Sequence, residues 1–200
     1  MNIKFYPNLF LITLILITGC KNIPTKPVAT GKIEKGIYTN AFFDLSMRIP
    51  EDWTVETLGK VEKTGEVAEE NMQEGVLVTN LLVIFAGNEE DEFKPNLAIT
   101  AEHRSLYPEC NSRNAKDYLD QVKKQYEKIE ASLSDVEKYT FANNTKCYSL
   151  DVTMELPNIK MSQTHYSVVK NKFYIDVVIT YQTDSQKEEL KKIVDSLRFN

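Results

Sequence analysis

The chain has 200 residues, of which 42% are hydrophobic and 26% charged, with 7 glycines and 7 prolines. This composition excludes intrinsic disorder, collagen-like repeats and low-complexity sequence, and the length suits a single domain. A formal net charge of −5 at pH 7 provides no basic surface for nucleic acid, and 3 cysteines are too few for a disulfide-dense scaffold.

The N-terminus has the parts of a bacterial lipoprotein signal. Lys4 and the N-terminal amine supply positive charge, and an apolar run from Leu9 to Thr18 follows. The run is shorter than the ~20 residues that cross a membrane, and it suits the hydrophobic region of a signal peptide. It ends in Ile17-Thr18-Gly19-Cys20, which resembles the lipobox, whose cysteine thiol receives a diacylglycerol. The alternative is an ordinary secretory signal with an incidental cysteine.

This signal predicts where the protein is found. We expect residues 1–19 to be removed and Cys20 to carry lipid chains that anchor the protein to a membrane outside the cytoplasm. Lys21 follows the cysteine where an aspartate usually means retention in the inner membrane, so the periplasmic face of the outer membrane is favoured in a Gram-negative host. Residues 20–36 contain two prolines and two glycines without a hydrophobic period, which predicts a flexible tether.

The first half of the remaining chain predicts mainly strands. Phe43, Leu45, Met47 and Ile49 alternate with more polar residues, which is typical of a half-buried strand. In chain order we expect a strand over 41–49, an extended segment over 53–58, one or two helical turns over 66–74, a buried strand over 75–87 and a strand over 96–104.

The second half predicts a long helix, a set of hairpins and a closing helix. The helix spans about 114–132, with Asn114 or Ser112 as its N-cap. Strands follow over 135–142, 146–156, 160–169 and 173–181, with asparagine-containing turns between them. Ser185 and Glu188 have the spacing of a capping box before the last helix. Successive hairpins indicate an antiparallel sheet, and the predicted class is α+β in one domain without internal repeats.

The order of these elements resembles the PsbP-like superfamily, which includes DcrB-like bacterial lipoproteins and a Ran-binding nuclear import factor. The opening motif is MRIPEDW, from Met47 to Trp53, and the closing helix ends in Ser196 to Phe199. The resemblance covers residues 37–200. It implies an α/β/α sandwich with a central antiparallel sheet of about seven strands flanked by helices. It also implies a binding, assembly or chaperone-like role, without a shared catalytic residue.

Chemically reactive motifs are scarce. The sequence has no G-x-S-x-G, no H-E-x-x-H and no glycine-rich phosphate loop. Both histidines, His103 and His165, lie in predicted strands, where neighbours such as Glu102 and His103 face opposite sides of the sheet and cannot chelate one metal. We therefore expect satisfied or surface histidines, no catalytic residue, no metal site and no cofactor.

Three other features have both a structural and a functional interpretation. The acidic run from Asn88 to Glu92 predicts a solvated hairpin loop, with a loose Ca²⁺ contact or a basic partner as the alternative. Cys110 and Cys147 remain after Cys20 is acylated and are candidates for a disulfide, the alternative being two unpaired thiols. Most aromatic residues suit the core, but alternation could place Tyr148, Tyr166 and Tyr174 on an open sheet face that binds a peptide or ligand.

These observations favour a non-enzymatic, membrane-anchored lipoprotein of the bacterial cell envelope that binds or assists a protein partner. The alternative is a lipoprotein that binds a small ligand in a pocket between sheet and helices. No interaction with nucleic acid is expected.

Overall fold

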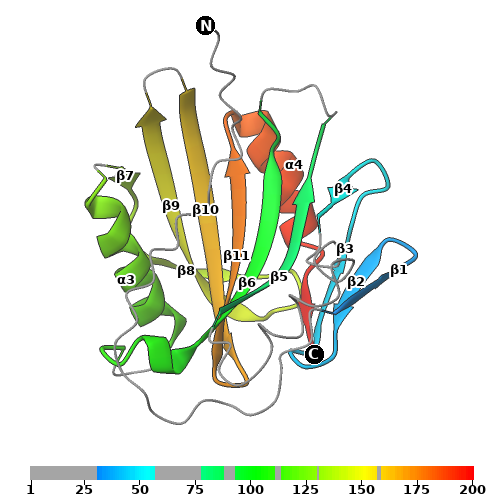
Figure 1. Ribbon diagram of the computed structural model, residues 1–200, viewed down its shortest axis with the longest axis horizontal. Helices are drawn as coiled ribbons and strands as arrows, with labels where there is room; N and C mark the ends of the chain where they lie inside the picture. Colours follow the sequence, from blue (N-terminus) through cyan, green and yellow to red (C-terminus); the bar gives the residue numbers. More distant parts are fainter. Residues whose placement is uncertain (1–30, 57–77, 88–92, 111–113, 130, 157–158) are drawn as a thin grey trace, which may run out of the picture.

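Two antiparallel sheets and two α-helices make up the part of the chain that the computed structural model describes, which is residues 31–56, 78–87, 93–110, 114–129, 131–156 and 159–200 (Figure 1). The strands are β1 (Lys32–Glu34), β2 (Ile37–Asn40), β3 (Leu45–Arg48), β4 (Thr54–Val55), β5 (Val78–Phe85), β6 (Asn96–His103), β7 (Ser132–Leu133), β8 (Glu137–Thr140), β9 (Lys146–Leu156), β10 (Ile159–Lys170), β11 (Phe173–Tyr181) and β12 (Arg198–Phe199). The helices are α3 (Ala115–Glu127), α4 (Asp184–Val194) and the short 3₁₀ helix η1 (Arg104–Leu106).

The larger sheet is the centre of the fold. Its strand order is β4-β5-β6-β11-β10-β9-β7, and β8 also pairs with β9. All of its pairings are antiparallel, and the long strands β9, β10 and β11 follow one another as hairpins. The smaller sheet has the order β1-β2-β3-β12. The predicted α+β class and its central antiparallel sheet of about seven strands are confirmed.

The two helices cover opposite sides of the large sheet. Helix α4 contacts β11 and β3, whereas α3 contacts β7, β9 and β10 (Figure 1). The larger core cluster joins α4, the small sheet and one side of the large sheet. A second cluster lies under α3 and includes Tyr118, Leu119, Val122, Leu150 and Tyr174. Since both sides are covered, every residue of β11 is buried, as expected for a central strand.

Turns and caps follow the sequence closely, with one shift. Asn144 and Asn171 have positive φ values of 63° and 48°, as hairpin turns require. Asn114 caps α3 as predicted, since its side chain accepts a hydrogen bond from the Asp117 backbone N–H. The predicted capping box of α4 is wrong by two residues, because Thr183 is the N-cap and pairs with Gln186.

The folded part of the chain begins before residue 37. Strand β1 pairs with β2, so the predicted tether extends too far by including Lys32–Glu34. Gly31 introduces this strand with φ +94°, and a Cβ there would lie 2.6 Å from the Thr39 carbonyl oxygen. Neither residues 1–19 nor Cys20 lies among the described residues, and the predicted turns over 66–74 do not either. Among the described helices, none has the length and apolar character to cross a membrane.

Candidate functional site

A group of polar side chains lies buried between the large sheet and helix α3. β6 contributes Glu102, β10 contributes Gln163, His165 and Ser167, and β11 contributes Asp176. We call these five residues the central polar cluster. Alternation along the strands brings them to one side, while the intervening residues of the same strands pack into the larger core. Buried polar groups need hydrogen-bond partners, and most of those partners come from α3 and the loop before it.

Glu102 connects the sheet to two tyrosines. The Tyr118 hydroxyl of α3 donates to Glu102 Oε1 at 3.0 Å, and the Tyr107 hydroxyl donates to Oε2. Burial raises the pKa of Glu102 above its ordinary value; the two hydroxyl donors oppose this rise, and the nearby charge of Asp176 adds to it. Burial also raises the pKa of Tyr118, so this hydroxyl keeps its proton and remains a donor.

His165 and Asp176 contact each other in the sheet, and His165 also contacts Tyr126 of α3. His165 Nδ1 lies 2.8 Å from Asp176 Oδ2, and both side chains are 4% exposed. An ionised carboxylate only accepts, so this nitrogen carries the proton. His165 Nε2 lies 3.3 Å from the Tyr126 hydroxyl, which donates to Gln163 Oε1 at 2.6 Å. Nδ1 is therefore hydrogen-bonded to Asp176, and Nε2 faces a hydroxyl whose one proton goes to Gln163.

Two oxygens of the central polar cluster lack such contacts. Asp176 Oδ1 and Ser167 Oγ are buried and have no hydrogen-bond partner among the described residues. The two residues stand directly opposite each other in the β10–β11 register. A buried acceptor without a donor is unfavourable by about 1–3 kcal/mol, and by more for a charged group. The centre of the sheet can thus accept hydrogen bonds that the surrounding described residues do not supply.

His103 lies on the other side of the sheet from Glu102, as alternation predicts. Its ring contacts Phe173 of the larger core at 5.0 Å between centroids. Its Nδ1 lies 2.8 Å from Ser105 Oγ and also accepts from the Ser105 backbone N–H, so His103 caps η1. Burial lowers the pKa of His103, and the charges of Lys172 and Arg104 lower it further.

The predicted disulfide between Cys110 and Cys147 is wrong. Both thiols are free and buried. Cys110 belongs to the cluster under α3, whereas Cys147 belongs to the larger core on the other side of the sheet. The sheet therefore separates the two sulfurs. Burial raises the pKa of the Cys147 thiol to about 12, which makes it a poor nucleophile.

The predicted tyrosine surface is also wrong as a common open face. Tyr148 and Tyr174 belong to the cluster under α3, but Tyr166 packs into the larger core. Tyr166 and Tyr174 are 3% and 0% exposed, and only Tyr148 is half-buried. Two of the three rings nevertheless lie on the same side of the sheet as the central polar cluster.

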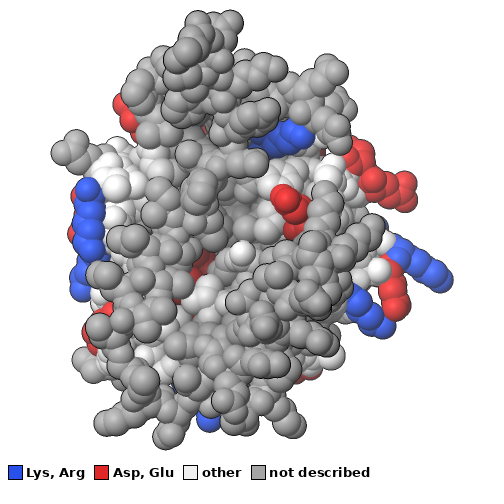
Figure 2. Space-filling view, in the orientation of Figure 1, with Lys and Arg blue, Asp and Glu red and all other residues white. Residues whose placement is uncertain are grey.

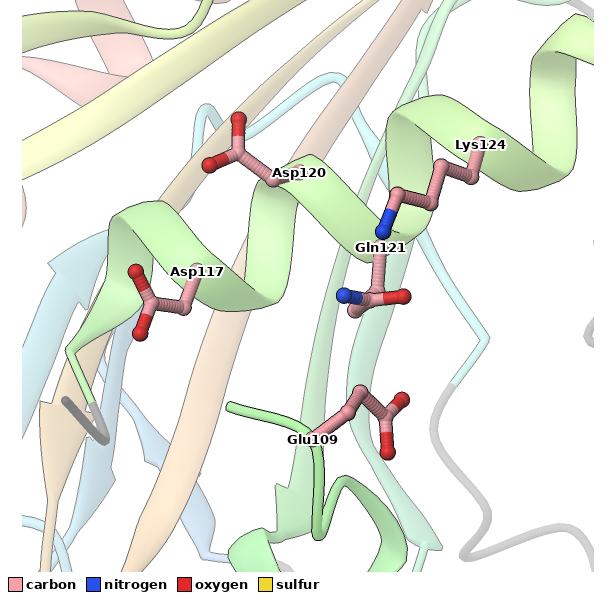
Figure 3. Close-up of a pocket in the computed structure, with 5 residues that line it drawn as sticks. All are labelled: Glu109, Asp117, Asp120, Gln121 and Lys124. Atoms are coloured by element: carbon pink, nitrogen blue, oxygen red, sulfur yellow. The ribbon is translucent and has the colours of Figure 1, made fainter. Parts of the chain in front are cut away.

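An open hollow lies beside the first turns of α3 (Figure 3). It has a volume of about 280 Å³ and is lined by Glu109, Asp117, Asp120, Gln121 and Lys124. Asp120 forms an ion pair of 2.8 Å with Lys116 one turn earlier. Within the described part of the chain, no group of three or more His, Cys, Asp or Glu side chains is arranged to hold a metal ion. The acidic run from Asn88 to Glu92 lies outside the described residues.

The sequence analysis did not identify Glu102 or Asp176 as site residues. Each interrupts an apolar strand, in ITAEH and in YIDVV. A carboxylate in a central strand is uncommon enough to indicate a buried polar site, and this signal could have found both.

Comparison with known proteins gives the fold. No protein-family model and no curated protein sequence matches the chain. The solution structure of cyanobacterial PsbP (CyanoP) from Synechocystis sp. PCC 6803 matches with a TM-score of 0.54 at 12% identity, over 92% of this chain and 99% of that one. The predicted resemblance is thereby confirmed at the level of fold, because the chain has the PsbP-like fold.

Two further structures overlap less well. LpqN, involved in cell envelope biogenesis of Mycobacterium tuberculosis, matches at 10% identity with a TM-score of 0.39, over 76% of this chain and 79% of that one. A protein from Bacteroides thetaiotaomicron matches at 12% identity with a TM-score of 0.39, over 78% of this chain and 45% of its own.

Proposed function

We propose that this protein is a lipoprotein of the bacterial cell envelope that is anchored through Cys20, and that its PsbP-like domain binds a partner protein without catalysing a reaction. The observation that carries the proposal is the motif Ile17-Thr18-Gly19-Cys20 at the end of an apolar run too short to span a membrane. Two or three acyl chains on Cys20 hold a protein stably at a membrane surface. Lys21 favours the periplasmic face of the outer membrane in a Gram-negative host.

The arrangement of polar groups supports a binding role over catalysis. Nucleophilic catalysis requires a nucleophile within reach of a base that a third group orients. His165 is oriented by Asp176, but its other nitrogen faces the Tyr126 hydroxyl, which donates to Gln163. His103 contacts Ser105 only two residues away, as the cap of η1. Both histidines thus stabilise local structure.

One observation favours the binding of a small ligand as a second candidate function. Asp176 Oδ1 and Ser167 Oγ are buried side by side without a hydrogen-bond partner among the described residues. Convergent polar groups inside a largely apolar surrounding are typical of ligand sites. The predicted alternative of a ligand bound between the sheet and α3 therefore remains a proposal, with these two residues as its centre.

Co-purification from the native membrane tests partner binding. The acylated protein is extracted from its envelope with mild detergent, and co-purifying proteins are quantified by mass spectrometry. Cys20→Ala removes the thiol that receives the lipid, while Cys110→Ala changes a buried thiol and serves as the matched control. We expect a partner in stoichiometric amount with the wild type and Cys110→Ala, and its loss with Cys20→Ala. Lipid alone in all three preparations would contradict the proposal.

A further inference from the structure

We propose that the centre of the sheet side facing α3 is a binding site for a small ligand that carries a protonated amine, held by the Asp176 carboxylate and the Ser167 hydroxyl. This inference goes beyond anchoring and partner binding and does not depend on either. It gives a chemical class to the ligand of the second candidate function.

The position and burial of the two residues are the first part of the argument. Asp176 and Ser167 are paired in register on the two central strands β11 and β10 and are 3% and 0% exposed. His165 occupies only one carboxylate oxygen of Asp176, at 2.8 Å. Asp176 Oδ1 is therefore an acceptor and the adjacent Ser167 Oγ a hydroxyl that can accept or donate, and neither has a hydrogen-bond partner among the described residues. A ligand with several N–H groups would satisfy both.

The charge of the surroundings favours a cation over a neutral donor. Glu102 and Asp176 are close enough for the charge of Asp176 to act on Glu102, and both are buried. His165 contacts Asp176 and is the one histidine that does so within the described part of the chain. On the face shown in Figure 2, the described Lys and Arg side chains are scattered and do not gather into one patch. Arg104, whose Nε is buried, is a described cation whose charge acts on Tyr174. Charge-assisted hydrogen bonds are roughly twice as strong as neutral ones, so a buried carboxylate oxygen selects a cationic donor.

Aromatic rings next to the carboxylates favour an ammonium group in particular. Tyr174 precedes Asp176 by two residues on the same strand, so both side chains point to the same side. The Tyr118 ring stacks on Tyr174 with 4.6 Å between centroids, and the Tyr107 ring meets both edge-on at 5.1 and 5.7 Å. Ammonium groups are attracted to the faces of such rings, and this attraction strengthens when water is excluded.

The number of free ligands distinguishes an amine from a metal ion. Zn²⁺ requires four ligands and Ca²⁺ six or more, whereas an ammonium group is held by two or three acceptors and a ring. The site offers Asp176 Oδ1 and Ser167 Oγ, because Glu102 already accepts from two tyrosines, His165 Nδ1 contacts Asp176 and His165 Nε2 faces Tyr126. Asp176 and Ser167 lie opposite each other on β11 and β10, and the next residue across the sheet is Tyr148 on β9, whose ring is half-buried.

Isothermal titration of the mature protein in detergent tests the site. The probes are n-butylammonium chloride, n-butanol as a neutral analogue of the same shape, and the chlorides of Mg²⁺ and Zn²⁺ at matched ionic strength. We expect saturable binding of butylammonium, at least tenfold weaker binding of butanol, and no saturable binding of either metal. Equal binding of the two butyl compounds, no saturable binding of butylammonium, or saturable binding of a metal alone would overturn the proposal.

Two variants locate the binding. Asp176→Asn keeps the shape of the side chain and removes its charge, so it should weaken butylammonium binding at least tenfold. Asp151→Asn changes a half-exposed carboxylate of β9 that pairs with Lys187, and it should bind like the wild type. If Asp176→Asn does not fold, Ser167→Ala removes the hydroxyl without adding bulk and should weaken binding at least tenfold. Binding at wild-type strength in the folded Asp176→Asn or Ser167→Ala variant would overturn the assignment.

Discussion

The contact between Tyr118 and Glu102 provides a quantitative test of how the central polar cluster holds α3. Tyr118→Phe removes one hydroxyl and leaves the ring stacked on Tyr174, so the buried apolar area hardly changes. Glu102 Oε1 then loses the donor at 3.0 Å. A hydrogen bond to a charged group contributes about 1.5–3 kcal/mol, and one to a neutral group about 0.5–1.5 kcal/mol. We therefore expect a loss of about 1.5–3 kcal/mol at pH values where Glu102 is ionised.

The dependence of this loss on pH is the more specific part of the prediction. Since the pKa of Glu102 is raised, the carboxyl is protonated over a wider range of acidic pH, where the loss should fall toward the neutral value. Urea unfolding of the wild type and Tyr118→Phe across this range measures it. Tyr139→Phe, which removes a donor to the half-exposed Asp195, is the matched control and should cost less than about 1 kcal/mol at every pH. A Tyr118→Phe loss no larger than that of the control, or one independent of pH, would refute the reasoning.

Three further predictions concern stability. The pKa of Glu102 is raised in the folded state, so its contribution to stability should be largest below the ordinary value of 4.5 and decline as pH rises through the folded-state pKa. Glu102→Gln should therefore flatten this part of a curve of Tm against pH. An unchanged slope would disprove the contribution of Glu102. Thr183→Ala should lower the free energy of unfolding by about 1 kcal/mol through loss of the α4 cap, as measured in denaturant titrations. Ser185→Ala should change that free energy by no more than about 0.5 kcal/mol. A larger loss with Ser185→Ala than with Thr183→Ala would contradict the assigned cap. Because Cys110 and Cys147 are free, a reductant should leave Tm unchanged and neither thiol should react with a thiol reagent in the folded protein; a reductant-sensitive Tm would show a disulfide instead.

The architecture could be predicted because alternation and helical period report directly on local structure. The strands over 146–156 and 173–181 and the turn at Asn171 follow the sequence patterns closely. The α4 cap was predicted two residues too late, because Thr183 with Gln186 and Ser185 with Glu188 both fit the capping-box spacing. Strand β1 was missed because three exposed residues between glycines look like a linker.

The site could not be predicted because alternation gives two sides of a strand but does not say which element covers each. In β11 every residue is buried, so hydrophobicity does not distinguish the side facing α3 from the side facing α4. Tyr166 and Tyr174 consequently ended on opposite sides, and so did Cys110 and Cys147. The polar residues that do converge come from the β10–β11 hairpin, whose register places Ser167 opposite Asp176, and from β6, which is far from that hairpin in sequence.

The central claim is that this domain works at a membrane surface to which Cys20 attaches it. Intact-mass and N-terminal peptide mass spectrometry of the protein purified from its native membrane tests that claim most directly. We predict a chain that begins at Cys20 and carries a diacylglycerol, with or without a further acyl chain on its amine. A mature chain that begins at another residue, or one with an unmodified Cys20 thiol, would contradict it.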